Sequence, residues 1–207
     1  MQRDLGRARP EAWRPPSRPL VVAACYACFD DGGRAWAGAA ATRHRRPIAT
    51  AVACAPVAHP YQPGLLARRE GPLLERALRS LVTPVDVVVV NATGRDHPRR
   101  AGLALHLGAA LDVPTVGVTD RPLVASAGVP AAERGAAAPL ELDGDCVGAV
   151  VRTRAGARPV VVHAAWRTDP DVALEVVMRC VRRARTPEPL RRARRAARVA
   201  RAGGRRA

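Results

Sequence analysis

The sequence has no lysine, so all 34 of its basic residues are arginine. Aromatic side chains are scarce, with three Trp, two Tyr and one Phe among 207 residues. No apolar run reaches the about 18 residues that a membrane-spanning helix needs, so no membrane span is expected. The first residues are positively charged, but no apolar segment follows them, which argues against a secretory signal peptide. These absences favour a cytoplasmic protein.

The five cysteines are an odd number, scattered through the chain, and this favours reduced thiols over a disulfide framework. Cys25 and Cys28 have the spacing of a metal or redox pair. On a strand, however, residues three apart point to opposite faces, and no second pair completes a site. We therefore interpret both as small core residues. The length suits one domain with a sizeable core, expected to be a monomer.

The net charge of +16 is unevenly distributed. Residues 182–207 hold 11 Arg and one acidic residue, Glu188, so this end is strongly basic and the rest moderately so. A charge run is often only a solvated segment. A purely cationic one also holds phosphate without sequence preference, so DNA or RNA is the partner that the charge favours.

Composition divides the chain into three parts. Residues 1–18 are rich in Pro and Arg and are expected to form a disordered leader. Residues 19–185 form the expected domain, which begins with strands at 20–29, 34–42 and 48–55 and a helix over 65–81. Residues 186–207 form an Arg-rich basic tail, either helical or disordered.

The centre of the chain combines a strand, a polar loop and a helix. Residues 85–90 are a β-branched run typical of a strand buried on both faces. A polar loop follows, and apolar residues at helical spacing predict a helix from about residue 99. Asn91 and His97 therefore lie beyond the carboxyl end of a strand, where ligands bind in open α/β sheets.

The pattern is weaker beyond this point. Residues 128–145 are expected to form a loop, and 148–154 with 158–163 a β-hairpin. Asp169 followed by Pro170 predicts the start of a helix, because Asp is a good N-cap and Pro suits the first helical position.

Four segments, in order along the chain, carry a resemblance to a known family. They are YQPGLLARRE, VDVVVVNATGRDHPRRAGLALHLG, PTVGV and GAVVRTRAGARPVVVHAAWR. The chain resembles the endonuclease V family, metal-dependent nucleases that cut near deoxyinosine in DNA or inosine in RNA. The resemblance implies an α/β, ribonuclease H-like fold. Its central mixed sheet has three antiparallel strands and then α/β alternation, with helices on both faces.

The resemblance also implies a Mg²⁺ (or Mn²⁺) site made by two Asp and one Glu, because Mg²⁺ prefers anionic oxygen ligands. The family's Asp positions fall on Tyr26 and Asn91 here, and only Glu70 is kept. A family Lys falls on Asp120, and a family His falls on Trp166.

His97 is kept beside Glu70 as a catalytic residue of the family pattern. Asp96 and Asp120 are the substitutes that could rebuild a weak metal site with Glu70. The sequence thus predicts a nucleic-acid-binding protein that is impaired in cleavage or lacks it. An active endonuclease cutting 3′ to (deoxy)inosine and a protein-interaction scaffold remain as alternatives.

The resemblance implies a binding surface as well. Tyr61 stands where the family has a tyrosine that acts as a wedge beside the damaged base, and stacking an aromatic ring on exposed bases suits that role. The other expected nucleic-acid contacts are Gly64, Arg95, Arg99 and Arg100.

Overall fold

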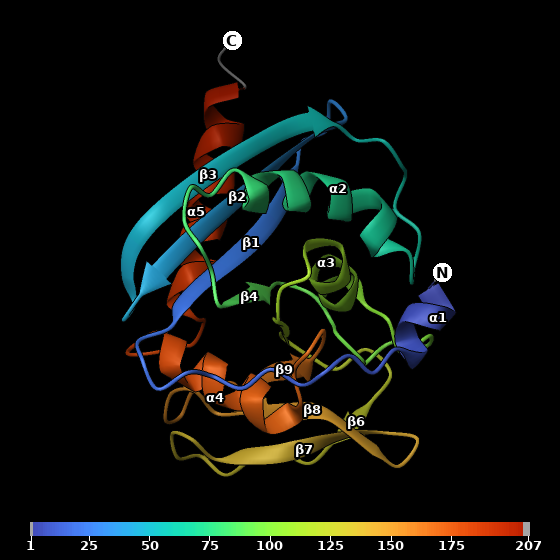
Figure 1. The fold of residues 1–207 in the computed structure, drawn as a ribbon, viewed down its shortest axis with the longest axis vertical. Coiled ribbons are helices and arrows are strands. Elements are labelled where there is room, and N and C mark those ends of the chain that lie inside the picture. Colours follow the sequence, from blue (N-terminus) through green and yellow to red (C-terminus); the bar gives the residue numbers. More distant parts are fainter. Residues whose placement is uncertain (1, 205–207) are drawn as a thin grey trace.

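The computed structural model describes residues 2–204, which form one continuous mixed sheet with helices on both of its faces (Figure 1). The strands are β1 (Val21–Phe29), β2 (Arg34–Arg43), β3 (Arg46–Pro56), β4 (Val87–Val90), β5 (Thr115–Thr119), β6 (Ser126–Ala127), β7 (Ala137–Leu142), β8 (Asp145–Val151) and β9 (Val160–Ala164). The helices are α1 (Gln2–Arg7), α2 (Leu66–Arg79), α3 (Leu103–Leu111), α4 (Pro170–Cys180) and α5 (Glu188–Gly204).

The strand order is β3-β2-β1-β4-β5-β9-β8-β7-β6. The first three strands form an antiparallel meander, and β1, β4 and β5 are parallel neighbours. The remaining strands add in antiparallel fashion. This is the predicted ribonuclease H-like arrangement. It places the carboxyl ends of β1 and β4 side by side, because parallel strands end at the same edge of a sheet.

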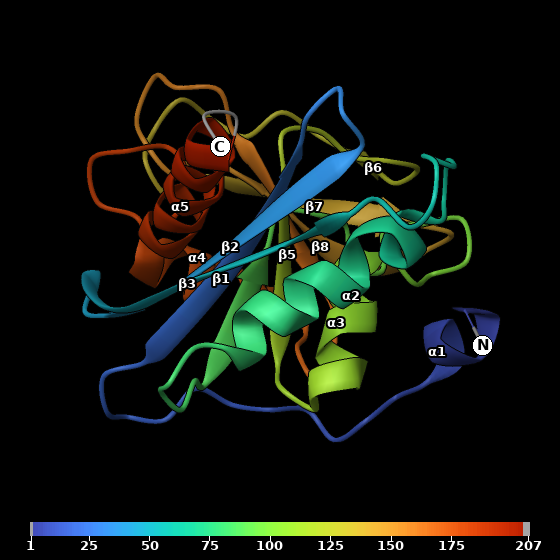
Figure 2. The same cartoon turned by 90° about the horizontal axis from the view of Figure 1, so that it is seen from above.

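Alternation along β1 divides the core between the two faces of the sheet. Val21, Ala23 and Cys25 pack in the cluster that contains α2 and α3. Val22 and Ala24 pack in the cluster that contains α4 and α5. Figure 2 shows α2 and α3 on the opposite side of the sheet from α5. Both Cys25 and Cys28 are buried free thiols, as expected of core residues.

The basic segment at the end of the chain is part of the domain, where a separate tail was expected. Leu190, Ala193 and Ala197 of α5 are buried against the sheet. The helix packs so closely on β2 that a Cβ at Gly38 would lie 2.3 Å from the carbonyl oxygen of Ala193. The arginines occupy the other side of an amphipathic helix. Residues 205–207 of the predicted tail lie outside the described residues.

The start of the chain also differs from the disordered leader expected for residues 1–18. Residues 2–7 form α1, which lies beside the loop after β4 (Figure 1). The Gln2 amide donates hydrogen bonds to the carbonyls of Gly64 and Ala101, at 3.1 and 2.9 Å. The Pro- and Arg-rich composition of this segment indicated that it would not pack on itself, but composition could not reveal these contacts with distant loops.

Two other boundaries were wrong for local reasons. α3 begins at Leu103, because Arg100 has a left-handed φ of 55° that a helix cannot include. The expected loop over 128–145 contains β7, whose Leu140 is fully buried. Asp169 caps α4 as predicted, since its side chain accepts a hydrogen bond from the Val172 N–H at 2.8 Å. Among the described residues, no helix is long and apolar enough to cross a membrane.

Candidate functional site

A small cavity of about 160 Å³ opens at the carboxyl ends of β1 and β4, against α2. Its lining residues are Cys25, Tyr26, Ala27, Leu66, Glu70, Leu74, Val90 and Asn91. The three positions that the family pattern assigns to metal ligands, Tyr26, Glu70 and Asn91, thus meet in one place. The fold brings them together because two of them lie on adjacent parallel strands and the third on the helix that covers them.

Glu70 is the one carboxylate of this cavity, and its environment weakens its charge. Burial raises its pKa to about 7, while the nearby Arg69 guanidinium opposes that rise. At neutral pH a large share of Glu70 therefore carries a proton. Burial, with the charge of Glu70 added, also raises the pKa of the Cys25 thiol well above its usual range, so this neighbour is a neutral thiol.

A cation from α5 contacts the other two positions. The Arg194 guanidinium lies over the Tyr26 ring, 5.0 Å from its centroid, and Arg198 lies 6.0 Å from the same ring. An Arg194 Nη2 donates to the Asn91 Oδ1 at 3.5 Å, at the long limit of a hydrogen bond. The amide oxygen that could face a metal is thus turned toward a positive charge.

These residues do not fit a magnesium or manganese ion. Such ions need several anionic oxygens in near-octahedral geometry, and here one partly protonated carboxylate is joined by a phenol and an amide. Arg194 places a guanidinium beside the same groups, and it would repel a divalent cation. Among residues 2–204 there is no group of three His, Cys, Asp or Glu side chains placed to hold a metal ion.

Asp96, considered above as a substitute ligand, is fully buried and engaged elsewhere. Its carboxylate accepts hydrogen bonds from the backbone N–H groups of Leu123, Val124 and Ala125, at 2.7, 2.9 and 2.8 Å. The His163 Nδ1 lies 3.6 Å from the same carboxylate. Asp96 therefore anchors the segment after β5, and its oxygens are not free for a metal at Glu70.

The other two replaced positions also lie outside the cavity. Asp120 pairs with Arg185 at 2.6 Å, and this hydrogen bond holds the pKa of its carboxyl below the usual range. Trp166 packs against α3, where a Cβ at Gly108 would lie 2.2 Å from the Trp166 Cβ. The rebuilt site of Glu70, Asp96 and Asp120 is therefore not assembled. Trp166 does not line the cavity of Glu70.

His97 joins two loops. It is buried, and burial lowers its pKa while a hydrogen bond with the backbone of Gly64 opposes the change. Its Nδ1 accepts a hydrogen bond from the Arg99 N–H at 3.1 Å. Gly64 has a φ of +74°, which favours glycine, and its missing Cβ leaves room for Arg99 and His97. His97 and Gly64 thus fix the loop after β4 against the loop that carries Tyr61.

Tyr61 is an exposed aromatic residue, with 62% of its surface accessible. Arg69 lies between it and Phe29, 6.0 Å from the Tyr61 centroid and 4.2 Å from that of Phe29. An exposed ring with a guanidinium beside it offers a face for stacking a base and a charge for its phosphate.

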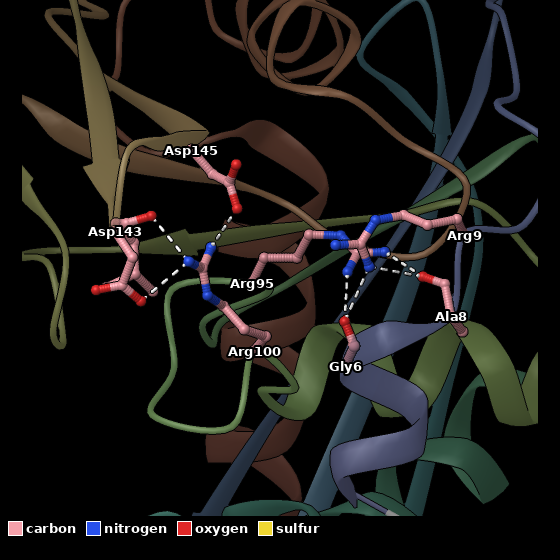
Figure 3. A network of polar contacts seen from close by, with 8 residues as sticks. Gly6, Ala8, Arg9, Arg95, Arg100, Asp143 and Asp145 are labelled. Carbon is pink, nitrogen blue, oxygen red and sulfur yellow. Dashed lines mark hydrogen bonds and ion pairs between the residues drawn. The ribbon is translucent and has the colours of Figure 1, made fainter.

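The predicted arginine contacts are already engaged in the structure (Figure 3). Arg95 donates to the carbonyls of Gly6 and Ala8, at 3.1 and 2.9 Å. Arg100 forms ion pairs with Asp143 and Asp145, at 3.0 and 3.2 Å. Arg99 donates to the Gln2 side chain at 3.2 Å. Arg95 and Arg99 therefore contact α1 or the residue that follows it.

Sequence reasoning missed Arg194 and Arg198, the residues that reach the cavity from α5. A run so rich in Arg reads as a solvated tail. The spacing of Leu190, Ala193 and Ala197 was the available signal, because three apolar residues at helical intervals mark a buried face. Burial of that face against the sheet sets the rotation of α5 and so places Arg194 and Arg198 beside Tyr26.

Comparison with known proteins identifies one family. A family model described as Endonuclease V matches residues 14–195. Endonuclease V of Nocardia farcinica is 42% identical over 206 residues, covering 97% of this chain and 89% of the relative. Endonuclease V of Methanopyrus kandleri is 49% identical over 132 residues, covering 64% of this chain and 57% of the relative. The chain thus spans less than two thirds of that second protein.

Solved structures agree on the fold. The crystal structure of endonuclease V from Streptomyces avermitilis has a TM-score of 0.91 and 36% identity, covering 98% of this chain and 91% of that one. Endonuclease V of Ciona intestinalis, solved with a 24mer DNA containing an inosine followed by a ribo-adenosine, has a TM-score of 0.80. At 17% identity, covering 98% of this chain and 95% of that one, it supports the fold alone.

Proposed function

This chain belongs to the endonuclease V family, and on that premise we propose that it binds nucleic acid while cleavage is impaired or lost. The family is one of metal-dependent nucleic-acid endonucleases. Membership sets the ligand class, but the residues of the site decide the chemistry. The proposed ligand is DNA or RNA, held on the face that carries Tyr61, the loop after β4 and the arginines of α5.

One observation carries the loss of cleavage: Glu70 is the single carboxylate in the cavity, and its pKa is raised to about 7. A hydrolytic metal site lowers the pKa of a bound water and offsets charge on the phosphate, and it needs ligands that hold the ion. Tyr26 and Asn91 supply no negative charge. With Arg194 in contact with both, the position favours an anion over a cation.

The same contacts support binding without metal. A guanidinium at Asn91 can hold a phosphate through paired N–H donors, which is a strong and directional contact. Tyr61 adds an exposed ring. Binding of this kind does not depend on Mg²⁺, so affinity in EDTA is expected to match affinity in Mg²⁺.

The test is a nicking assay run together with a binding assay on one labelled duplex that contains deoxyinosine. We expect retention of the duplex without nicking in Mg²⁺, in Mn²⁺ and in EDTA. Nicking that disappears in Glu70→Ala would establish the active endonuclease instead. Absence of binding to duplex or single strands, with a folded protein, would favour an interaction scaffold.

A restored variant provides the matched positive control. Tyr26→Asp, Asn91→Asp and Arg194→Ala together return two carboxylates and remove the competing cation. Mn²⁺ is expected to raise the thermal midpoint of this variant and leave that of the wild type unchanged, because an ion that binds only the folded state stabilises it. Equal stabilisation of both proteins would mean that Mn²⁺ binds at a place that the three substitutions do not change, and it would contradict this prediction.

A further inference from the structure

A basic concavity, separate from the cavity of Glu70, lies at the amino end of α5. It has a volume of about 890 Å³ and lies between the β2–β3 turn and the segment that joins α4 to α5. Its arginines are Arg43, Arg45, Arg46, Arg182, Arg183 and Arg191. We call this set of residues the basic groove. Pro19, just before the start of β1, lines the groove, whereas Tyr26 lies toward the other end of that strand.

The groove is positive and poorly neutralised. Its one carboxylate, Glu188, already pairs with Arg191 and Arg192, each at 2.8 Å. Within the described part of the chain, no carboxylate forms an ion pair with Arg182 or Arg183. A concave surface lined by charges of one sign concentrates counter-ions, so an anionic ligand is the class that it favours.

The β2–β3 turn holds its arginines in an unfavourable arrangement. Arg43 and Arg46 are direct cross-strand partners, and like charges in that position destabilise a sheet. Between them, His44 and Arg45 have φ values of +50° and +63°, a backbone that Asn-Gly adopts at far lower cost. A phosphate between the two strands would offset the repulsion. Strain and repulsion retained at one turn are typical of a binding site.

The groove is continuous with the candidate site through α5. Arg191 lines both the groove and an adjoining concavity of about 530 Å³, which also contains Arg194 and Arg198. Arg194 in turn contacts Asn91. From Arg191 to Arg198 the helix rises roughly 10 Å. This distance is short enough for one strand of nucleic acid to contact both places.

We propose that the basic groove binds backbone phosphates of the same nucleic-acid strand that lies at the Asn91 cavity, so that the footprint runs along α5 to the β2–β3 turn. The inference rests on the proposed function, since it extends the contact surface of that ligand. It assigns a role to the arginines of the β2–β3 turn and of the α4–α5 connection.

The experiment compares two charge-reversal variants of the full chain. The groove variant is Arg46→Glu/Arg183→Glu. Its control is Arg134→Glu/Arg154→Glu, which changes the net charge equally at two exposed positions next to β7 and β8, across the sheet from β3. Thermal midpoints establish that all proteins are folded. Binding of a labelled single strand of about 24 nucleotides is followed by fluorescence anisotropy in EDTA over a range of salt concentrations.

The groove variant is expected to bind at least about ten-fold more weakly than the control at low salt. The slope of log affinity against log salt should become less negative by about 1.4, because two phosphate contacts are lost and each contact on a single strand contributes about 0.7. A strand too short to span α5 should show a smaller difference between the two variants.

Two results would overturn the inference while leaving the proposed function intact. One is that wild type binds but the groove and control variants have the same affinity and salt slope. The other is that the groove variant loses affinity for pyrophosphate yet binds the long strand as the control does, which would assign the groove to a small phosphorylated ligand. Failure of the wild type to bind any strand is a different outcome, and it contradicts the proposed function itself.

Discussion

At the scale of single residues, His163 makes the fold sensitive to acid. It is fully buried, its Nε2 lies 2.8 Å from the Thr119 hydroxyl, and burial lowers its pKa to about 4 from an ordinary 6.5. Below pH 6.5 the unfolded chain takes up a proton that the folded chain refuses. The contribution of His163 to stability is therefore full above pH 6.5 and is lost as the pH falls toward 4.

We expect His163 to lower the free energy of unfolding by about 2 kcal/mol as the pH is lowered from 7 to 5, while the raised pKa of Glu70 acts in the opposite direction over the same range. His163→Gln removes the first contribution and keeps the second, so lowering the pH should favour the variant over wild type by about 2 kcal/mol, although the variant is less stable at pH 7. Urea unfolding at the two pH values measures both. Curves with the same pH dependence for wild type and variant would exclude His163 as the cause.

Tyr61 offers a second test at this scale. If its exposed ring stacks on a base, Tyr61→Ala should lose about 1–3 kcal/mol of binding free energy, whereas Tyr61→Phe should bind like wild type. The loss should be insensitive to salt, because stacking releases no counter-ions. Anisotropy titrations at two salt concentrations separate this effect from that of an arginine. An unchanged affinity in Tyr61→Ala would mean that the ring lies outside the contact surface.

At the scale of elements, α1 covers residues that the sequence assigned to nucleic-acid contact. It engages Arg95, Arg99 and the carbonyl of Gly64. Burial, followed by the charges of Arg9 and Arg100, lowers the pKa of Arg95 to about 10. A ligand that needs these guanidinium groups has to compete with the N-terminal segment.

Removal of residues 1–9 is therefore expected to raise the affinity for a single strand several-fold, since a binding-competent surface that is only partly populated lowers the apparent affinity. The measurement is a comparison of dissociation constants at one salt concentration. Its control is Arg3→Ala/Arg7→Ala, which keeps α1 but removes two of its charges. A truncated chain that binds more weakly than wild type would show that α1 contributes to binding.

The elements also show what sequence could and could not predict. The meander, β4 and the helix of Glu70 were predicted to within a few residues, because β-branched runs and leucine spacing are local signals. The meeting of Tyr26, Glu70 and Asn91 followed from the family resemblance and the rule for parallel strands. Asp96 and α5 were misjudged, since their partners come from distant segments: the residues after β5 for Asp96, and β1 and β2 for α5.

At the scale of the whole molecule, charge dominates any encounter with nucleic acid. The chain carries a net charge of +16, with arginine as its sole cationic side chain apart from His. Because guanidinium groups stay charged over the whole accessible pH range, the contribution of the arginines to binding should not titrate between pH 6 and 9. The accompanying release of counter-ions makes that contribution strongly dependent on salt.

We expect affinity for a deoxyinosine duplex and for its inosine-free equivalent to fall together as salt is raised, with a slope of about −0.9 per phosphate contacted. Any preference for the inosine strand, expressed as a ratio of affinities, should stay constant with salt, because contacts to the base release no counter-ions. Filter binding at four salt concentrations measures both slopes. Affinities that do not change with salt would contradict an electrostatic interface.

The edges of the sheet have a consequence for handling the protein at high concentration. Within residues 2–204, β3 pairs only with β2. Pro47 and Pro56 at its ends lack N–H groups, and Arg76 donates a hydrogen bond to the carbonyl of Cys54 within it. The opposite edge, β6, is just two residues long. The prolines and the Arg76 contact interrupt the edge of β3, and β6 is too short to pair with another copy over many residues. Growth of fibrils by strand addition is therefore hindered at both edges of the folded sheet.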